Sequence, residues 1–261
     1  TSRIPTSYES AILGRRILAL SPLATLSTVF PATYNTPANE DADGGLGGVP
    51  IGLMDYIADC DPDGAAGSEG DGDGNGHRSG KLGNGNPTIL AIRIATSFKN
   101  VDAGSNMSVS VNWVPPHPPS KRIESHHSSS PGCAAGCADG FLHNHDHDTV
   151  PYSAANLPRF SLLGYLEPIL TTPATSTIQD LQSCFLASHP DARYWLPGNR
   201  IHTSEWVRLV VTQVYWIGGF GDRAYIGWIP VEEWHNVTRE EWESVRLPGE
   251  KKGWKEWSVG S

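Results

Sequence analysis

The chain has 261 residues, of which 38% are hydrophobic, and a formal net charge of -9 at pH 7. This length and composition predict a single soluble domain with one sizeable core. The longest apolar run, residues 12–26, contains Arg15, Arg16 and Pro22, so no segment approaches the roughly 20 apolar residues of a membrane span. No cluster of lysine and arginine suits a phosphate backbone, which excludes nucleic acid as an expected partner.

The first elements are predicted from spacing and stop signals. Apolar residues recur at helical spacing over residues 8–20, with Ser7 as the expected N-cap and Pro22 as the stop. Strands are predicted for residues 23–30 and 49–58, which are rich in apolar and β-branched side chains.

The middle of the chain predicts two further strands joined by a polar connection. Residues 88–95 form a short apolar run, and residues 96–105 are polar. Residues 107–113 alternate strictly, which is typical of a half-buried strand. The apolar face of that strand carries Met107, Val109, Val111 and Trp113.

The last third contains the clearest pattern of elements. A strand is predicted at 159–169, a helix at 175–188, and a strand at 207–217. Gly218, Gly219 and Gly221 indicate a tight bend into another strand. A final helix is predicted for residues 230–245.

Three long segments interrupt this pattern and are predicted to be inserted loops. They are residues 34–48, 59–87 and 115–156, all rich in loop-forming residues. One domain is therefore expected over residues 1–247, followed by a tail at 248–261. Its two tryptophans would gain from burial, so a tail packed on the domain and a free tail are equally expected.

Several motifs resemble those of the CREG family of secreted cellular-repressor glycoproteins. The resembling residues are Ser188-His189-Pro190, Trp195, the strand 207–217, Gly218 to Gly221, and Ile229-Pro230-Val231-Glu232-Glu233-Trp234. The segments RRILALSPLATLSTVF and RFSLLGYLEPI also match in order. The resemblance implies a mostly antiparallel split barrel of the FMN-binding, pyridoxamine 5'-phosphate oxidase-like type, with flanking helices, that pairs as a homodimer.

A cofactor site follows from the same resemblance. Flavin-binding relatives hold the FMN phosphate just after the strand that matches residues 88–95, and here that place offers Thr96, Ser97 and Lys99, with Arg93 close by. Two hydroxyls and one or two cations suit a phosphate. The simpler interpretation is a polar connection, because flavin-binding members bring more basic residues and CREG members are regarded as having an obstructed pocket.

A histidine-rich stretch offers an alternative chemistry. In an extended segment His143, His145 and His147 would point to one side, and imidazole is a common ligand of zinc and copper. No rigid element is predicted to fix such ligands, so a solvated loop is the favoured interpretation.

Cysteines and sequons bear on the compartment. Cys60, Cys133, Cys137 and Cys184 allow three disulfide pairings, of which a local Cys133–Cys137 bridge is favoured over a zinc site. Asn106 and Asn236 begin glycosylation sequons. The chain opens on polar residues rather than a signal peptide, which is consistent with a mature terminus. Together with the resemblance, these features predict a secreted or endolysosomal protein.

The function ranked first is a secreted CREG-like glycoprotein that binds a protein or small-molecule ligand without redox turnover. The alternatives are an FMN-dependent oxidoreductase and a metal-binding protein that uses the histidine-rich loop. No catalytic residue is predicted, because no serine lies in a G-x-S-x-G turn and no cysteine is paired with a histidine on a predicted rigid element.

Overall fold

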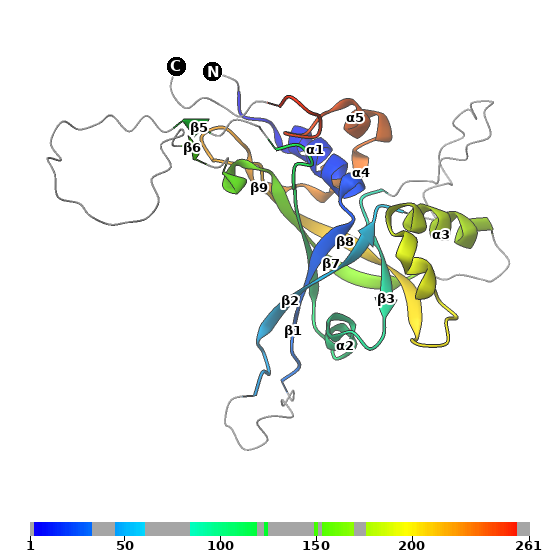
Figure 1. Ribbon diagram of the computed structural model, residues 1–261. Coiled ribbons are helices and arrows are strands. Elements are labelled where there is room, and N and C mark those ends of the chain that lie inside the picture. Colours follow the sequence, from blue (N-terminus) through cyan, green and yellow to red (C-terminus); the bar gives the residue numbers. More distant parts are fainter. Residues whose placement is uncertain are drawn as a thin grey trace, which may run out of the picture.

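The computed structural model describes residues 3–32, 45–60, 84–118, 123–124, 149–150, 153–169 and 176–254. Its centre is an antiparallel barrel (Figure 1). Six strands pair in the order β3-β2-β1-β4-β7-β8, and the first part of β8 pairs back with β3 to close the ring. Strand β9 pairs with the last part of β8, on the edge opposite β7. The predicted split-barrel type with flanking helices is confirmed.

The strands of the barrel sheet are β1 Leu23–Val29, β2 Pro50–Ala58, β3 Thr88–Ile92, β4 Met107–Asn112, β7 Arg159–Pro168, β8 Ser204–Ile217 and β9 Ile226–Ile229. A separate two-stranded sheet pairs β5 Ile123–Glu124 with β6 Thr149–Val150. The helices are α1 Ser7–Leu20, α2 Thr96–Asp102, α3 Ser176–Ser188, α4 Val231–Asn236 and α5 Arg239–Ser244, with short 3-10 turns at Ala154–Asn156 and Pro190–Tyr194.

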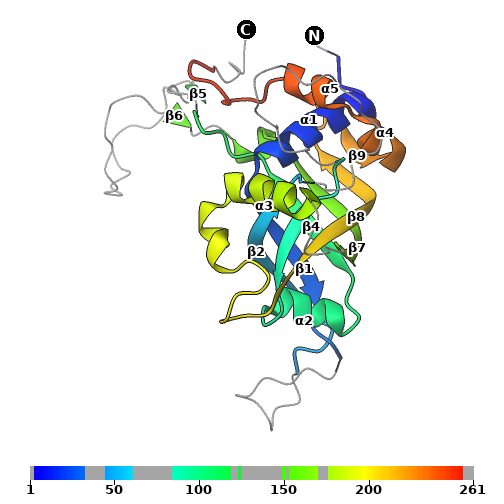
Figure 2. The same cartoon turned by 90° about the vertical axis from the view of Figure 1, so that its right-hand side faces the viewer.

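The helices cover different parts of the barrel. Helices α1, α4 and α5 lie together at one end and α2 at the other, while α3 lies along the side, as the two views agree (Figures 1 and 2). None of the described helices is long and apolar enough to cross a membrane.

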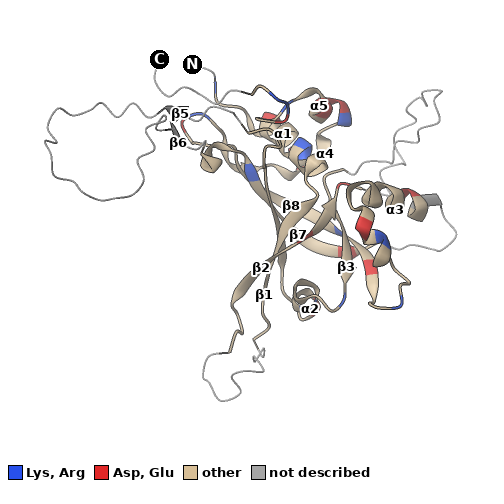
Figure 3. Ribbon diagram, viewed as in Figure 1, with Lys and Arg blue, Asp and Glu red and all other residues tan. Residues whose placement is uncertain are grey.

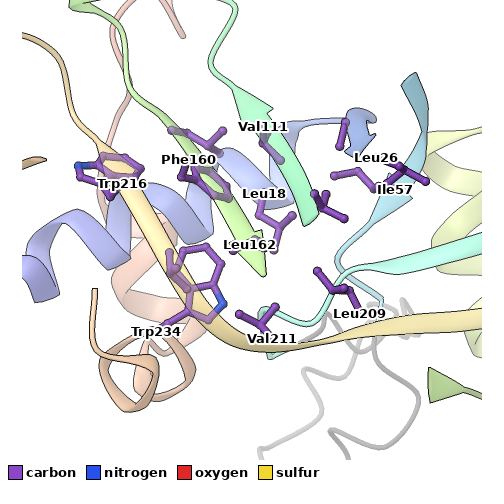
Figure 4. Packing of buried hydrophobic residues seen from close by; sticks show 14 of the residues in the cluster. Leu18, Leu26, Ile57, Val111, Phe160, Leu162, Leu209, Val211, Trp216 and Trp234 are labelled. Carbon is purple, nitrogen blue, oxygen red and sulfur yellow. The ribbon is translucent and has the colours of Figure 1, made fainter. Parts of the chain in front are cut away.

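The barrel interior is filled by apolar side chains, as the alternation along the strands predicts. Leu26, Val109, Leu162 and Leu209 are fully buried, and Figure 4 shows Leu18 from α1 and Trp234 from α4 beside this cluster. Each fully buried leucine contributes about 1.5–3 kcal/mol relative to its exposed state. The core therefore lies inside the barrel and extends under α1 and α4.

Two predicted segments differ from the structure. Residues 96–105, expected as a polar connection, contain helix α2, because Phe98 is buried in the core and Asn100 Nδ2 donates a 3.0 Å hydrogen bond to Thr28 Oγ1. The single helix expected at 230–245 is two helices, because Val237 has extended backbone angles and Thr238 begins α5.

The N-caps of both terminal helices follow the same chemistry. Thr6, and not Ser7, caps α1 in a capping box with Glu9, and Thr238 caps α5 in a capping box with Glu241. Such caps typically contribute about 1 kcal/mol each.

The first residues of the predicted tail pack against the barrel end. Arg16 on α1 forms an ion pair with Glu250 and donates from Nη1 to Trp242 O at 3.2 Å. Trp113 Nε1 donates to Pro248 O at 2.6 Å. Trp254 is partly buried against the core. Residues 255–261 lie outside the described part of the chain.

This contact predicts a pH-dependent contribution to stability. The hydrogen bond from Arg16 lowers the pKa of Glu250 below its ordinary value of 4.5. A depressed pKa in the folded state contributes stability above the ordinary value, and this is lost as pH falls through the folded pKa. We expect Glu250→Gln to be less stable than wild type at neutral pH but to lose less stability on acidification below about pH 4.5. Urea unfolding midpoints measured across this range check it, and parallel profiles for the two proteins would contradict it.

Candidate binding surface

The residues predicted to hold the FMN phosphate lie where β3 passes into α2. Arg93 forms ion pairs with Asp102 and with Glu205, each at 2.8 Å. The hydrogen bond to Asp102, with further attraction from Glu205, raises the pKa of Arg93 above its ordinary value. The guanidinium is therefore already engaged by two carboxylates.

The other three residues of that set are on α2. Thr96 and Ser97 open the helix, with Ser97 buried and Thr96 half-buried, and Lys99 is exposed. The structure thus brings the two hydroxyl residues together in one helical turn and directs Arg93 toward carboxylates. Glu205 comes from β8, and no signal in the sequence links it to Arg93.

The histidine set and the favoured cysteine pair are not described by the structure. His143, His145, His147, Cys133 and Cys137 all lie outside the described residues, so the metal site and the local disulfide stay predictions. Within the described ranges no three His, Cys, Asp or Glu side chains gather as a metal site.

The other two cysteines form a disulfide. Cys60, two residues after β2, is bonded to Cys184 on α3, across a sequence separation of 124 residues. This pairing is one of the three that the sequence allows, and it is compatible with a Cys133–Cys137 bridge.

The motif Ser188-His189-Pro190 has a structural role. Helix α3 ends at Ser188, and the buried His189 ring stacks on Tyr56 with 4.3 Å between centroids. His189 Nε2 is 2.9 Å from Ile57 O, so the ring fastens the end of α3 to β2. The interpretation of this motif as a helix end is confirmed.

Both sequon asparagines are exposed. Asn106 immediately precedes β4, and Asn236 is the last residue of α4. Neither position is blocked by packing among the described residues.

The outer face of the barrel presents a row of register partners that the sequence analysis did not identify. Successive pairs run across six strands from β2 to β9. In order, the row is Met54, Thr25, Ser110, Ser161, Tyr215 and Trp228. Small hydroxyl residues occupy its centre and larger apolar groups its two ends. Alternation marks such positions as outward, but only the strand order brings them together.

Strands β1 and β2 form a long pair that extends away from the rest of the barrel, which we call the β1–β2 arm (Figure 1). Met54 on this arm is 74% exposed. Other exposed aliphatic residues on the arm are Leu23, Val29 and Leu53, and the exposed Val49 immediately precedes β2. Strand β1 carries no charged residue and β2 carries only Asp55, so the arm is almost uncharged (Figure 3).

Burial raises the pKa of Asp55, the single charge of the arm, above its ordinary value, while a backbone hydrogen bond from Tyr56 opposes this shift. The direction follows from the cost of ionising a carboxyl group that is partly removed from water. Strands β1 and β2 therefore carry one partly buried carboxyl group beside their exposed aliphatic side chains.

Comparison with solved structures finds resemblances at low identity. A haem-binding protein from Mycobacterium smegmatis is 16% identical with a TM-score of 0.47; the match covers 90% of this chain and 62% of that one, so this chain spans under two thirds of its length. An FAD-binding protein from Mesorhizobium loti is 14% identical with a TM-score of 0.35, covering 76% of this chain and 87% of that one. An FAD and haem binding protein from M. smegmatis is 13% identical with a TM-score of 0.37, and the match covers 83% of this chain and 79% of that one.

Comparison with curated proteins finds no match. Comparison with family models finds one that covers more than half of the chain. The model described as "CREG, beta-barrel" matches residues 76–236, which include α2, α3, α4 and every barrel strand except β1 and β2. The chain therefore belongs to the CREG beta-barrel family.

Proposed function

We propose that this protein is a secreted CREG-type glycoprotein that acts by binding a protein or small-molecule ligand, without redox turnover. The observation that carries the proposal is the engagement of Arg93 by Asp102 and Glu205. A flavin phosphate placed beside these carboxylates would meet like charge, and Lys99 is the one remaining cation of the predicted set. The segment that would have to hold FMN is thus poorly suited to a dianion.

The experiment is a visible absorption spectrum of the purified protein, followed by titration with FMN. We expect no flavin absorbance and no saturable FMN binding. A flavin spectrum, or saturation near one FMN per chain, would replace this proposal with the flavin-dependent oxidoreductase. In that case Lys99→Ala should weaken FMN binding by about 1–3 kcal/mol, the range for a charged hydrogen bond.

The oxidoreductase remains the second candidate because of one local feature. Thr96 and Ser97 begin α2, so two hydroxyl residues lie within one helical turn of Lys99. This segment lacks positive charge for a phosphate, since Arg93 is paired with Asp102 and Glu205.

The compartment is proposed from covalent chemistry. The Cys60–Cys184 disulfide is typical of oxidising compartments, and both sequon asparagines are exposed. We expect Asn106→Gln and Asn236→Gln each to lower the mass of protein secreted from a eukaryotic host by one glycan. Mass spectrometry with and without glycosidase treatment measures this. Unchanged masses in both variants would remove glycosylation from the proposal.

We further propose that the protein forms a homodimer through the β1–β2 arm. The arm exposes several aliphatic side chains, of which Met54 is the most exposed, and exposed apolar surface often marks an interface. We expect Met54→Lys to shift the protein from dimer to monomer in light scattering after size exclusion. Ile201→Lys is the matched control, because Ile201 is also 74% exposed but precedes β8. A monomeric wild type, or equal effects of the two variants, would contradict an interface at the arm.

A further inference from the structure

A shallow groove of about 270 Å³ lies on the outer face of the barrel, lined by residues of β1, β4, β7 and β8. Its floor carries the hydroxyl groups of Thr25, Ser110 and Ser161, which are register partners in adjacent strands. Ser110 Oγ and Ser161 Oγ are 2.7 Å apart, so the two side chains share one hydrogen bond. Each hydroxyl has both donor and acceptor capacity, and the shared bond uses only part of it.

Arg159 supplies a positive charge at this groove. It is paired in register with Asn112, whose exposed amide also lines the groove. Arg159 Nη1 makes two long contacts, to Ala155 O at 3.3 Å and to Leu157 O at 3.5 Å. These contacts position the guanidinium but satisfy few of its five donors.

The charge of Arg159 has no counter-charge in the described part of the chain. No described carboxylate lies within ion-pair distance of it, and the groove lining contains no acidic residue. Arg93 and Arg208, by contrast, each form an ion pair with a carboxylate. The groove therefore carries a net positive charge on a surface of otherwise neutral polar groups.

One wall of the groove is aromatic. Tyr215 is 36% exposed and meets the more exposed Trp228 edge to face, with ring centroids 5.0 Å apart. A partly exposed aromatic ring beside convergent hydroxyl and amide groups offers both an apolar contact and hydrogen bonds. That combination suits a ligand with an apolar C–H face and several hydroxyl groups.

We propose that this groove binds a single sugar unit that carries a carboxylate, as in a uronic acid. The carboxylate pairs with the Arg159 guanidinium, a geometry that favours two parallel hydrogen bonds. The ring lies against Tyr215, and its hydroxyl groups meet Ser110 and Asn112. The volume is close to the lower end of small-molecule clefts, about 300 Å³, which limits the ligand to one sugar unit. This inference rests on the proposed binding function and names the ligand class.

The test is a calorimetric titration of the full-length protein with D-glucuronate, with D-glucose and acetate as separate ligands. Glucose keeps the hydroxyl groups without the charge, and acetate keeps the charge without the ring. We expect saturable glucuronate binding that is at least about tenfold tighter than binding of either control ligand, the advantage expected when a charged hydrogen bond and a ring contact act together.

Three variants locate the site. Arg159→Gln should weaken glucuronate binding about tenfold and remove its advantage over glucose. Tyr215→Ala should weaken glucuronate and glucose alike. Arg239→Gln is the matched control, because it removes an arginine that pairs with Glu243 on α5, away from the groove lining, and it should leave the affinity unchanged.

Absence of saturable glucuronate binding by folded wild type would overturn the proposal, as would undiminished binding by Arg159→Gln. Acetate binding as tight as glucuronate would also overturn it, because the site would then recognise only an anion. The same samples are titrated with FMN. If FMN does not bind and glucuronate does not bind, the groove proposal alone fails; if FMN saturates, the proposed function fails whatever the glucuronate result.

Discussion

Asp59→Asn is expected to lower the free energy of unfolding by about 3–5 kcal/mol, the typical result of removing one partner of a buried ion pair. The Asp59 side chain is fully buried and that of Arg15 is 2% exposed, with 3.5 Å between Arg15 Nη2 and Asp59 Oδ2. Asp59 Oδ1 also accepts a 3.2 Å hydrogen bond from Gly85 N. The variant keeps the shape of the side chain but removes the negative charge that faces the buried Arg15 cation.

The surroundings of this pair leave little room for relaxation. Arg15 Nη1 donates to Trp234 O at 3.1 Å, and its guanidinium lies 5.8 Å from the centroid of the Trp234 ring. Trp234 Nε1 donates to Gly85 O at 3.0 Å. Gly85 has a φ of 91°, and a Cβ there would lie 2.5 Å from Trp234 Nε1. One buried cluster therefore joins α1, the end of β2, α4 and the strand that follows Gly85.

Urea unfolding followed by tryptophan fluorescence measures the effect. Asp102→Asn is the control, because it breaks the exposed pair with Arg93 and should cost less than about 1 kcal/mol. The double variant Arg15→Met, Asp59→Leu should be less destabilised than the sum of its single variants, since no buried charge remains. Equal losses in Asp59→Asn and Asp102→Asn would show that the buried pair contributes no more than a surface pair.

The strands of this protein could be predicted because their signal is local. The alternation at residues 107–113 gives β4, and the side chains on its apolar face are buried as that pattern requires. Helix α2 could not be predicted, because it is only seven residues long and mostly polar. It depends on burial of Phe98 in the core and on the hydrogen bond from Asn100 to Thr28. Barrel closure between β3 and β8 depends on a contact between segments more than 100 residues apart.

The candidate sites also contain some residues that the sequence could select and others that only the fold brings together. Thr96, Ser97 and Lys99 could be selected from family resemblance, but the engagement of Arg93 depends on Glu205, which only the fold brings near. The groove at Arg159 could not be predicted, because Asn112 and Arg159 become neighbours only through the register of β4 and β7. Charged and hydroxyl residues on outward strand positions carry no sequence signal that distinguishes a ligand groove from ordinary surface.

Removal of the Cys60–Cys184 disulfide is the other change expected to have a large effect. We expect the double variant Cys60→Ala, Cys184→Ala to lose about 2–5 kcal/mol of unfolding free energy, because the bond closes a long loop in the unfolded chain. The sequence separation is 124 residues, and loop-closure entropy rises with that length. The bond also joins α3 to the chain just after β2. It lies in a hydrophobic cluster that includes Phe185 and Trp206 and is separate from the barrel interior.

Comparison of two cysteine pairs separates loop closure from the loss of thiols. The control variant Cys133→Ala, Cys137→Ala removes two cysteines only four positions apart, so any bond between them would constrain a much shorter loop. Urea midpoints of both variants, and of wild type with and without reductant, give the comparison.

The reduced wild type should match the Cys60, Cys184 variant, because both have lost the same constraint. If reductant leaves the wild type unchanged while the Cys60, Cys184 variant is destabilised, the loss comes from packing of the two side chains. The stability of α3 on the barrel would then rest on its apolar contacts and on His189 rather than on the covalent bond.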